Sequence, residues 1–127
     1  MTIEELRIRI DELDRQLVDL LSERARAAQM IGGLKAATSL PVYEPNREKI
    51  IYANVRAANK GPLPDIELTH IYERIIDVMR ALQRDELASE RNALAQAEGH
   101  GTVAKLPQRQ VPVVGDPSET PETGKKQ

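Results

Sequence analysis

The chain has 127 residues, a length typical of one domain, and its 18 basic and 20 acidic residues leave a net charge of −2. A charge so close to neutral argues against a nucleic-acid-binding protein. Without Cys, and with only His70 and His100 as imidazoles, the chain has no disulfides or thiolate ligands, and we expect no metal site.

The hydropathy pattern indicates a protein outside the membrane. No apolar run approaches the ~20 residues that span a bilayer. The N-terminus, MTIEELRIRIDELDRQ, alternates charges where a signal peptide has an apolar core, so we expect a cytoplasmic protein. Phe and Trp are absent and Tyr occurs three times. The core must therefore be built from Leu, Ile, Val, Ala and Met, a composition typical of packed helices.

The N-terminal segment predicts one long helix over about residues 3–36. Thr2 followed three residues later by Glu5 is the signature of a capping box. Beyond it, apolar residues recur at helical spacing at Leu6, Ile10, Leu13, Leu17, Leu20, Leu21, Ala28 and Ile31. At 1.5 Å per residue, such a helix is about 50 Å long.

A second apolar edge, formed by Val18 and Ala25, flanks this stripe and carries Arg7. A helix this long cannot bury two edges within so small a chain, so we expect it to pair with a second copy. The expected fold is all-α: a three-helix protomer with a long first helix, in an intertwined helical homodimer.

Gly32 and Gly33 interrupt the helical pattern, at a cost of roughly 1 kcal/mol each relative to Ala. Such a pair either ends the helix early or lets another backbone or a ligand come close. We favour the close approach.

Two further helices and a polar tail are predicted. Pro45 suits the first turn of a helix over about residues 45–59. Asp65 is the expected N-cap of a third helix that reaches about residue 97. Residues 1–97 then form a helical domain. Residues 98–127, rich in Pro, Gly, Thr and charge, form a predicted disordered C-terminal tail.

Two cations lie on the apolar side of the first helix. Arg24 and Lys35 fall within roughly 20° of each other, at the centre of the apolar stripe. Burying a cation costs folding free energy unless an anion or a dipole lies close enough to compensate its charge. Either internal salt bridges or a bound anion must therefore be present. Taken singly, Arg24 could be an ion-paired surface residue, and Lys35 could complement the helix dipole.

The other two helices also carry polar residues on apolar faces. Beside Ile51 and Val55 lie Glu44, Arg47 and Glu48, and beside Tyr72, Ile76 and Met79 lies Gln83. Glu48 could simply pair with a neighbouring cation. The joint pattern contains cations, a carboxylate that can accept from a hydroxyl, and one neutral amide donor. It favours a site for a small polyanion over a catalytic dyad.

The order of these residues resembles a known family. The segments LRIRIDELDRQLVDLLSER, then Lys35, then PVYEPNRE and IIDVMRALQ are similar to the all-helical class of chorismate mutase, the type II domain, over about residues 3–87. The resemblance implies an isomerase of aromatic amino-acid biosynthesis, the shikimate pathway. In that family a helical homodimer binds chorismate, a dicarboxylate, and converts it to prephenate by a Claisen rearrangement.

The resemblance also implies a role for each residue. Arg24 and Lys35 bind carboxylates, and Lys35 and Gln83 donate to the ether oxygen. Glu48 accepts from the substrate hydroxyl, where the backbone amide of Glu44 helps. Arg47 acts nearby or through water, Arg7 crosses into the partner's site, and Met79 departs from the family by standing where a serine is often found. The predicted catalytic residues are Lys35, Gln83, Arg24 and Glu48, and the predicted substrate-binding residues are Arg7, Arg24, Lys35, Glu44, Arg47, Glu48, Met79 and Gln83.

The implied reaction needs no nucleophile, proton transfer, metal or cofactor. The enzyme must clamp both carboxylates and stabilise charge on the ether oxygen. Two alternatives stay open: an isochorismate pyruvate-lyase of the same architecture, and a non-catalytic regulatory module that binds a partner enzyme of the aromatic pathway. The presence of both Glu48 and Gln83 favours the mutase.

Overall fold

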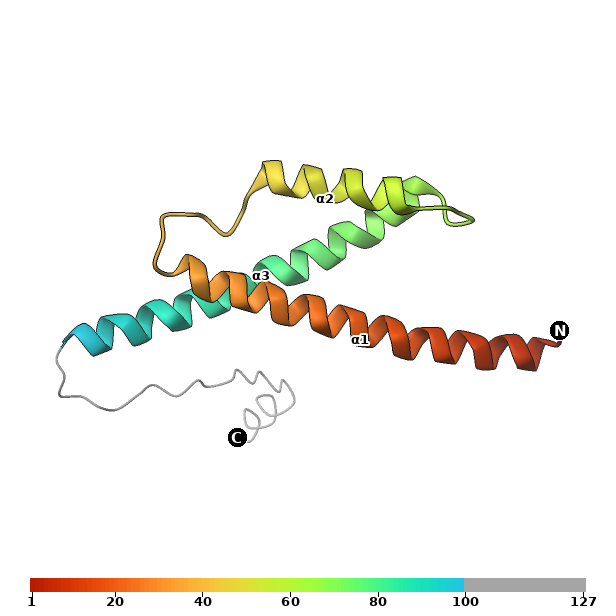
Figure 1. The fold of residues 1–127 in the computed structure, drawn as a ribbon, viewed down its shortest axis with the longest axis horizontal. Helices are drawn as coiled ribbons and strands as arrows, with labels where there is room; N and C mark the ends of the chain where they lie inside the picture. The colour runs from red at the N-terminus through yellow and green to blue at the C-terminus, as the bar shows by residue number, and fades with distance from the viewer. Residues whose placement is uncertain (100–127) are drawn as a thin grey trace, which may run out of the picture. The chain divides into compact units, whose positions relative to one another are not determined.

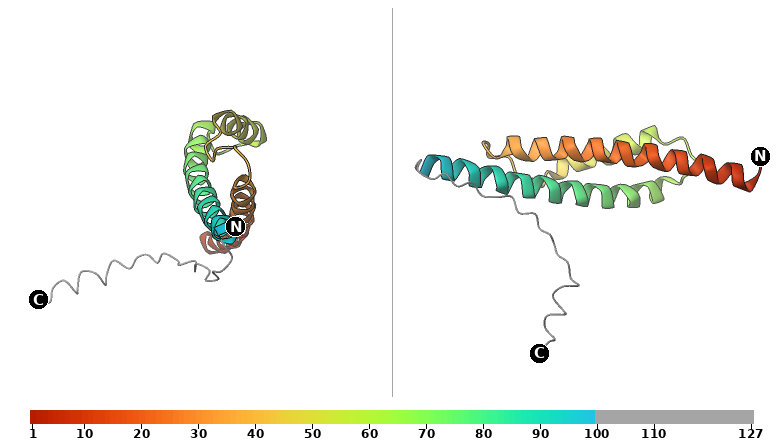
Figure 2. Two further views of the ribbon diagram at one scale, coloured as in Figure 1. Left: turned by 90° about the vertical axis from the view of Figure 1, so that its left-hand side faces the viewer. Right: turned by 90° about the horizontal axis from the view of Figure 1, so that it is seen from below.

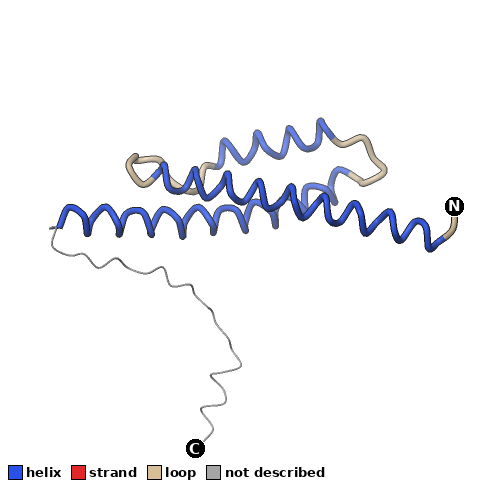
Figure 3. Tube along the Cα trace, turned by 60° about the horizontal axis from the view of Figure 1, so that its bottom comes forward, coloured by secondary structure: helices blue, strands red, loops and turns tan. Residues whose placement is uncertain are grey.

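The computed structural model describes residues 1–99, which form three helices and no strand (Figure 3). The helices are α1 (Ile3–Lys35), α2 (Pro45–Ala58) and α3 (Asp65–Gly99), so the all-α prediction is confirmed. The chain divides into two compact units, residues 1–91 and 92–127, and the first contains α1, α2 and α3 up to Arg91. The predicted tail beyond Gly99 lies outside the described residues. Among the described helices, none combines the length and apolar content that a bilayer crossing requires.

The start of α1 is fixed by the predicted capping box. The Thr2 backbone N–H donates to Glu5 Oε1 at 2.8 Å, and the Glu5 N–H donates to Thr2 Oγ1 at 3.0 Å. These two bonds satisfy N–H groups that have no partner within the helix. At the other end α1 runs through Gly32 and Gly33 to Lys35. The glycine pair therefore does not end the helix.

The turn between α2 and α3 is organised by Asn59. Its Nδ2 donates at 2.7 Å both to the Leu63 carbonyl and to Asp65 Oδ1, and its Oδ1 accepts from the Gly61 N–H at 3.0 Å. The N-cap prediction for Asp65 is wrong by one residue: Asp65 is the first residue of α3, and the Pro64 carbonyl accepts the first helical bond, from the Leu68 N–H at 3.0 Å. The Asp65 side chain is engaged by Asn59 instead.

Within residues 1–91, α1 and α3 run in the same direction and lie side by side, and α2 runs back along α3 (Figure 1, Figure 2). The two helices α1 and α3 come close together at Gly32. A Cβ atom built there would lie 2.5 Å from the Gln83 carbonyl oxygen and 2.7 Å from its Cα. The predicted close approach is therefore confirmed, and it is between two backbones. Gly33 is looser, since its nearest neighbour would be Glu90 Cγ at 3.5 Å.

The first two thirds of α1 leave their apolar side chains uncovered. Among the described residues, the buried apolar side chains are Ala28, Ile76 and Met79, all in the half of the unit nearest the helix crossing. The uncovered residues of this part of α1 are between 42% and 68% exposed; they are Ile3, Leu6, Ile8, Ile10, Leu13, Leu17, Val18 and Leu20. So continuous an apolar stripe is unusual on the surface of a monomeric protein.

Candidate active site

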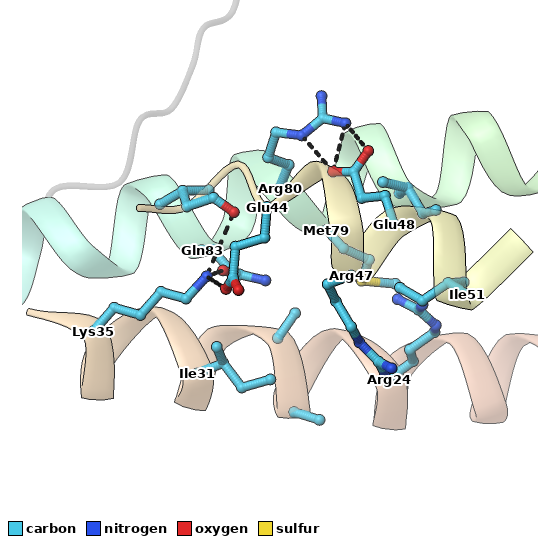
Figure 4. Close-up of a pocket in the computed structure, with 14 residues that line it drawn as sticks. Arg24, Ile31, Lys35, Glu44, Arg47, Glu48, Ile51, Met79, Arg80 and Gln83 are labelled. Atoms are coloured by element: carbon cyan, nitrogen blue, oxygen red, sulfur yellow. Dashed lines mark hydrogen bonds and ion pairs between the residues drawn. The ribbon is translucent and has the colours of Figure 1, made fainter. Parts of the chain in front are cut away.

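A cavity of about 410 Å³ lies between the three helices of the first unit, close to the crossing of α1 and α3 (Figure 4). Its volume is in the range of small-molecule binding sites. Seven of the eight predicted substrate-binding residues line it; they are Arg24, Lys35, Glu44, Arg47, Glu48, Met79 and Gln83. Apolar side chains fill the spaces between the charges; they are Ala27, Ala28, Ile31, Val42, Ile51 and Ile76.

Lys35 is the most deeply buried charged group of the described residues, with 4% of its surface exposed. Its Nζ lies 2.7 Å from Glu44 Oε2, 3.0 Å from Gln83 Oε1 and 3.4 Å from the Val42 carbonyl oxygen. Oxygens from the segment before α2 and from α3 therefore converge on one ammonium. Of the two predicted partners for a buried cation, the structure shows the internal salt bridge, with Glu44.

Glu44 takes part through its side chain, which the sequence interpretation did not anticipate. The resemblance assigned a role to its backbone amide, whereas the structure shows its carboxylate paired with Lys35. Glu44 immediately precedes α2, at the N-cap position, but its side chain makes no capping hydrogen bond. The carboxylate does not cap α2 because it points back to α1, where it pairs with Lys35.

The orientation of the Gln83 amide follows from its neighbour. A Lys ammonium can only donate hydrogen bonds, so the atom that faces Lys35 Nζ must be the amide oxygen. The amide nitrogen then points elsewhere and, within residues 1–99, donates to no protein group. Gln83 is consequently a fixed neutral donor at the wall of the cavity, next to the only strongly buried ammonium of the described region.

Glu48 is paired with a cation that the sequence interpretation missed, Arg80. Arg80 Nη2 donates to both carboxylate oxygens at 2.9 Å, and Nε donates to Oε2 at 3.1 Å. These hydrogen bonds raise the pKa of Arg80 above its ordinary value. The spacing Ile76, Arg80, Gln83 is the i, i+4, i+7 pattern of one helix face, so periodicity could have placed Arg80 beside the site.

Two cations of the cavity have no acidic partner. Within residues 1–99, neither Arg24 nor Arg47 forms an ion pair, although both line the cavity. Figure 4 shows their side chains pointing toward one another on the far side of the cavity from Lys35. The Arg24 guanidinium also lies over the Tyr72 ring, 5.9 Å from its centre, a contact that holds the arginine without neutralising it.

Arg7 and Met79 complete the predicted set. Arg7 does not line the cavity of its own chain. It lies 17 residues before Arg24 on the same helix, or about 25 Å at 1.5 Å per residue. Met79 is buried, with 6% exposed, and presents a thioether to the cavity. A thioether cannot donate the hydrogen bond that a serine would give to a carboxylate.

No cluster of His, Cys, Asp or Glu suited to a metal ion occurs in the described part of the chain.

The fold and the cavity define an all-helical protein with a cationic pocket of small-molecule size. Comparison with known proteins gives the particular family. Residues 6–84 match the family described as chorismate mutase type II, and the chain belongs to this family.

Relatives and a solved structure agree with this membership. A chorismate mutase of Methanocaldococcus jannaschii is 32% identical over 89 residues, which cover 69% of this chain and 90% of that protein. A bifunctional chorismate mutase/prephenate dehydratase of Aquifex aeolicus is 37% identical over 86 residues, 65% of this chain but 24% of that protein. The chain thus spans about a quarter of such bifunctional relatives. The structure of chorismate mutase (form II) from Thermus thermophilus superposes with a TM-score of 0.62 at 37% identity, covering 64% of this chain and 92% of that one.

Proposed function

We propose that this chain is a chorismate mutase that converts chorismate to prephenate in its helical pocket. The observation that carries the proposal is the charge pattern of the cavity. Four cations line it, of which Lys35 and Arg80 are neutralised by Glu44 and Glu48, while Arg24 and Arg47 have no acidic partner within residues 1–99. Two free guanidinium groups fit a substrate that carries two carboxylates, because Arg binds carboxylates through paired hydrogen bonds.

The proposed mechanism is conformational clamping with electrostatic stabilisation. The rearrangement is pericyclic, so the reacting bonds form and break within the substrate, and the protein has to hold the folded conformer. Negative charge grows on the ether oxygen as its C–O bond lengthens. The positive charge of Lys35 Nζ and the amide N–H of Gln83, which has no protein acceptor within residues 1–99, lie next to each other and supply this stabilisation from a site shielded from bulk water.

The direct test is turnover of chorismate by the purified chain. We expect loss of the ultraviolet absorbance of chorismate with formation of prephenate, and we expect Lys35→Ala to abolish it. Isochorismate is assayed in parallel for release of pyruvate, since a lyase of the same architecture would act on that substrate. Turnover of isochorismate alone would assign the lyase, and turnover of neither would leave a binding module of the aromatic pathway.

The uncovered stripe of α1 supports a proposed homodimer. In it, the exposed N-terminal residues of α1 pack against a second copy, and Arg7 reaches the partner's cavity. A protomer that buries only Ala28, Ile76 and Met79 among its described apolar side chains has little core of its own. Pairing of two α1 helices would bury the stripe and would bring a further cation to each site.

Mixing two inactive variants tests the shared site. Arg7→Ala and Lys35→Ala proteins, each inactive alone, are mixed and allowed to exchange subunits. A heterodimer carries one site with both residues and one site with neither, so a 1:1 mixture should recover about a quarter of wild-type activity if exchange is statistical. Absence of recovery, after exchange has been confirmed with tagged subunits, would place Arg7 outside the partner's site.

A further inference from the structure

Arg80 is fixed on three sides. Its Nε and Nη2 donate to the Glu48 carboxylate at 2.9 to 3.1 Å, and its Nη1 donates to Asp77 Oδ1 at 3.2 Å. The face of the guanidinium lies over the Tyr43 ring, 5.1 Å from its centre. The side chains of Arg80 and Glu48 are 27% and 17% exposed, so the pair is largely shielded from solvent. Contacts from α2, α3 and the segment before α2 thus leave this guanidinium with one orientation.

This arrangement of Arg80 also fixes the side chain of Glu48. A Glu side chain has three rotatable bonds, and the cavity contains two other guanidinium groups to which a free carboxylate could turn. A forked contact between Arg and carboxylate fixes the plane of the carboxylate as well as its position. Oε2 receives two of the three hydrogen bonds from Arg80 and Oε1 receives one. Oε1 therefore keeps capacity for one more donor.

We propose that Arg80 is a positioning residue for Glu48, which it holds at the cavity wall with one carboxylate oxygen available to the ring hydroxyl of the substrate. The inference rests on the proposed function, in which Glu48 accepts that hydrogen bond. In this proposal Arg80 acts through Glu48 and not on the substrate, because its Nε and Nη2 donate to Glu48, its Nη1 donates to Asp77, and its face lies over Tyr43.

The first arm of the test is a double-mutant cycle. Arg80→Met removes the forked contact and keeps side-chain length, and we expect kcat/KM for chorismate to fall by up to about 100-fold, as when a reacting group is misplaced. Arg80→Lys keeps the charge without the fork and should show a smaller loss. In the Glu48→Gln background, Arg80→Met should add little further loss, because residues that act as a unit are not additive. Losses that multiply in the double variant would overturn the proposal.

The second arm uses a chorismate analogue that lacks the ring hydroxyl. The analogue gives Glu48 nothing to accept, so the ratio of wild-type to Arg80→Met kcat/KM should fall to nearly one. A ratio that stays the same as with chorismate would show that Arg80 supports the fold or contacts the substrate directly, and would overturn the proposal. Arg74→Met is the matched control: it removes the same group from an exposed position of α3 that has no ion pair within residues 1–99, and it should leave kcat/KM unchanged.

The two hypotheses fail differently. If the wild-type chain does not convert chorismate, the proposed function fails, and the role of Arg80 falls with it. If the wild-type chain is active while Arg80→Met matches it, only the role of Arg80 fails. Melting temperatures of all variants identify any that are unfolded. If Arg80→Met does not fold, Arg80→Lys, which retains the charge beside Glu48, takes its place in both arms of the test.

Discussion

Gly32→Ala is expected to destabilise the chain strongly, by about 3 kcal/mol, near the upper end of the range for overpacking substitutions. The added methyl group would lie 2.5 Å from the Gln83 carbonyl oxygen and 2.7 Å from its Cα. These are backbone atoms, so no side chain can rotate away, and α1 and α3 must separate. Because Gln83 and Lys35 meet just beyond this contact, activity should fall together with stability. Denaturant unfolding at one fixed protein concentration measures the effect.

The adjacent glycine supplies the matched control. A methyl group at Gly33 would meet Glu90 Cγ at 3.5 Å and Glu86 Cγ at 3.7 Å, which are ordinary contacts with flexible side chains. Gly33→Ala should therefore be neutral or stabilising by up to about 1 kcal/mol, from helix propensity alone. If both variants lose stability equally, the close approach of α1 and α3 does not explain why a glycine is needed at position 32.

The three helices could be predicted because their signals are local. Apolar periodicity and the Thr2–Glu5 capping box set α1 to within a residue of its observed end, and Pro45 marked the start of α2. The glycine pair shows where local reasoning stops. Both residues carry the same sequence signal, yet only Gly32 faces a backbone, because the crossing point of two helices is a property of their packing.

Two site partners were missed for the same reason. The Lys35–Glu44 and Glu48–Arg80 pairs join residues of different helices or loops, and periodicity within one helix does not report which cation meets which carboxylate. The sequence did place Arg24, Lys35 and Gln83 on inward faces, and all three line the cavity. Helical spacing therefore predicted residues of the cavity wall, whereas the tertiary structure decided which of the charges there have an acidic partner within residues 1–99.

Gln83→Glu is expected to lower kcat at neutral pH by about 10²- to 10³-fold, the usual cost of losing a preorganised donor to a developing oxyanion. Gln83 Oε1 lies 3.0 Å from Lys35 Nζ, so an introduced carboxylate would pair with that ammonium. Once ionised, it would also have no hydrogen to donate and would repel the charge that grows on the ether oxygen. Both effects act on the chemical step, which single-turnover measurements with chorismate would isolate.

The pH dependence distinguishes loss of the donor from loss of the side chain. A carboxyl group donates only when protonated, and its ordinary pKa is about 4.3. The neighbouring Lys35 favours the ionised form, so rescue should require acid. The quantity to follow is the activity of the variant divided by that of the wild type at each pH, because this ratio cancels any pH dependence that the two proteins share. This ratio should rise as the pH falls for Gln83→Glu and stay low and flat for Gln83→Ala. If Gln83→Glu matches the wild type at neutral pH with its fold intact, the amide is a bystander and Lys35 alone stabilises the ether oxygen.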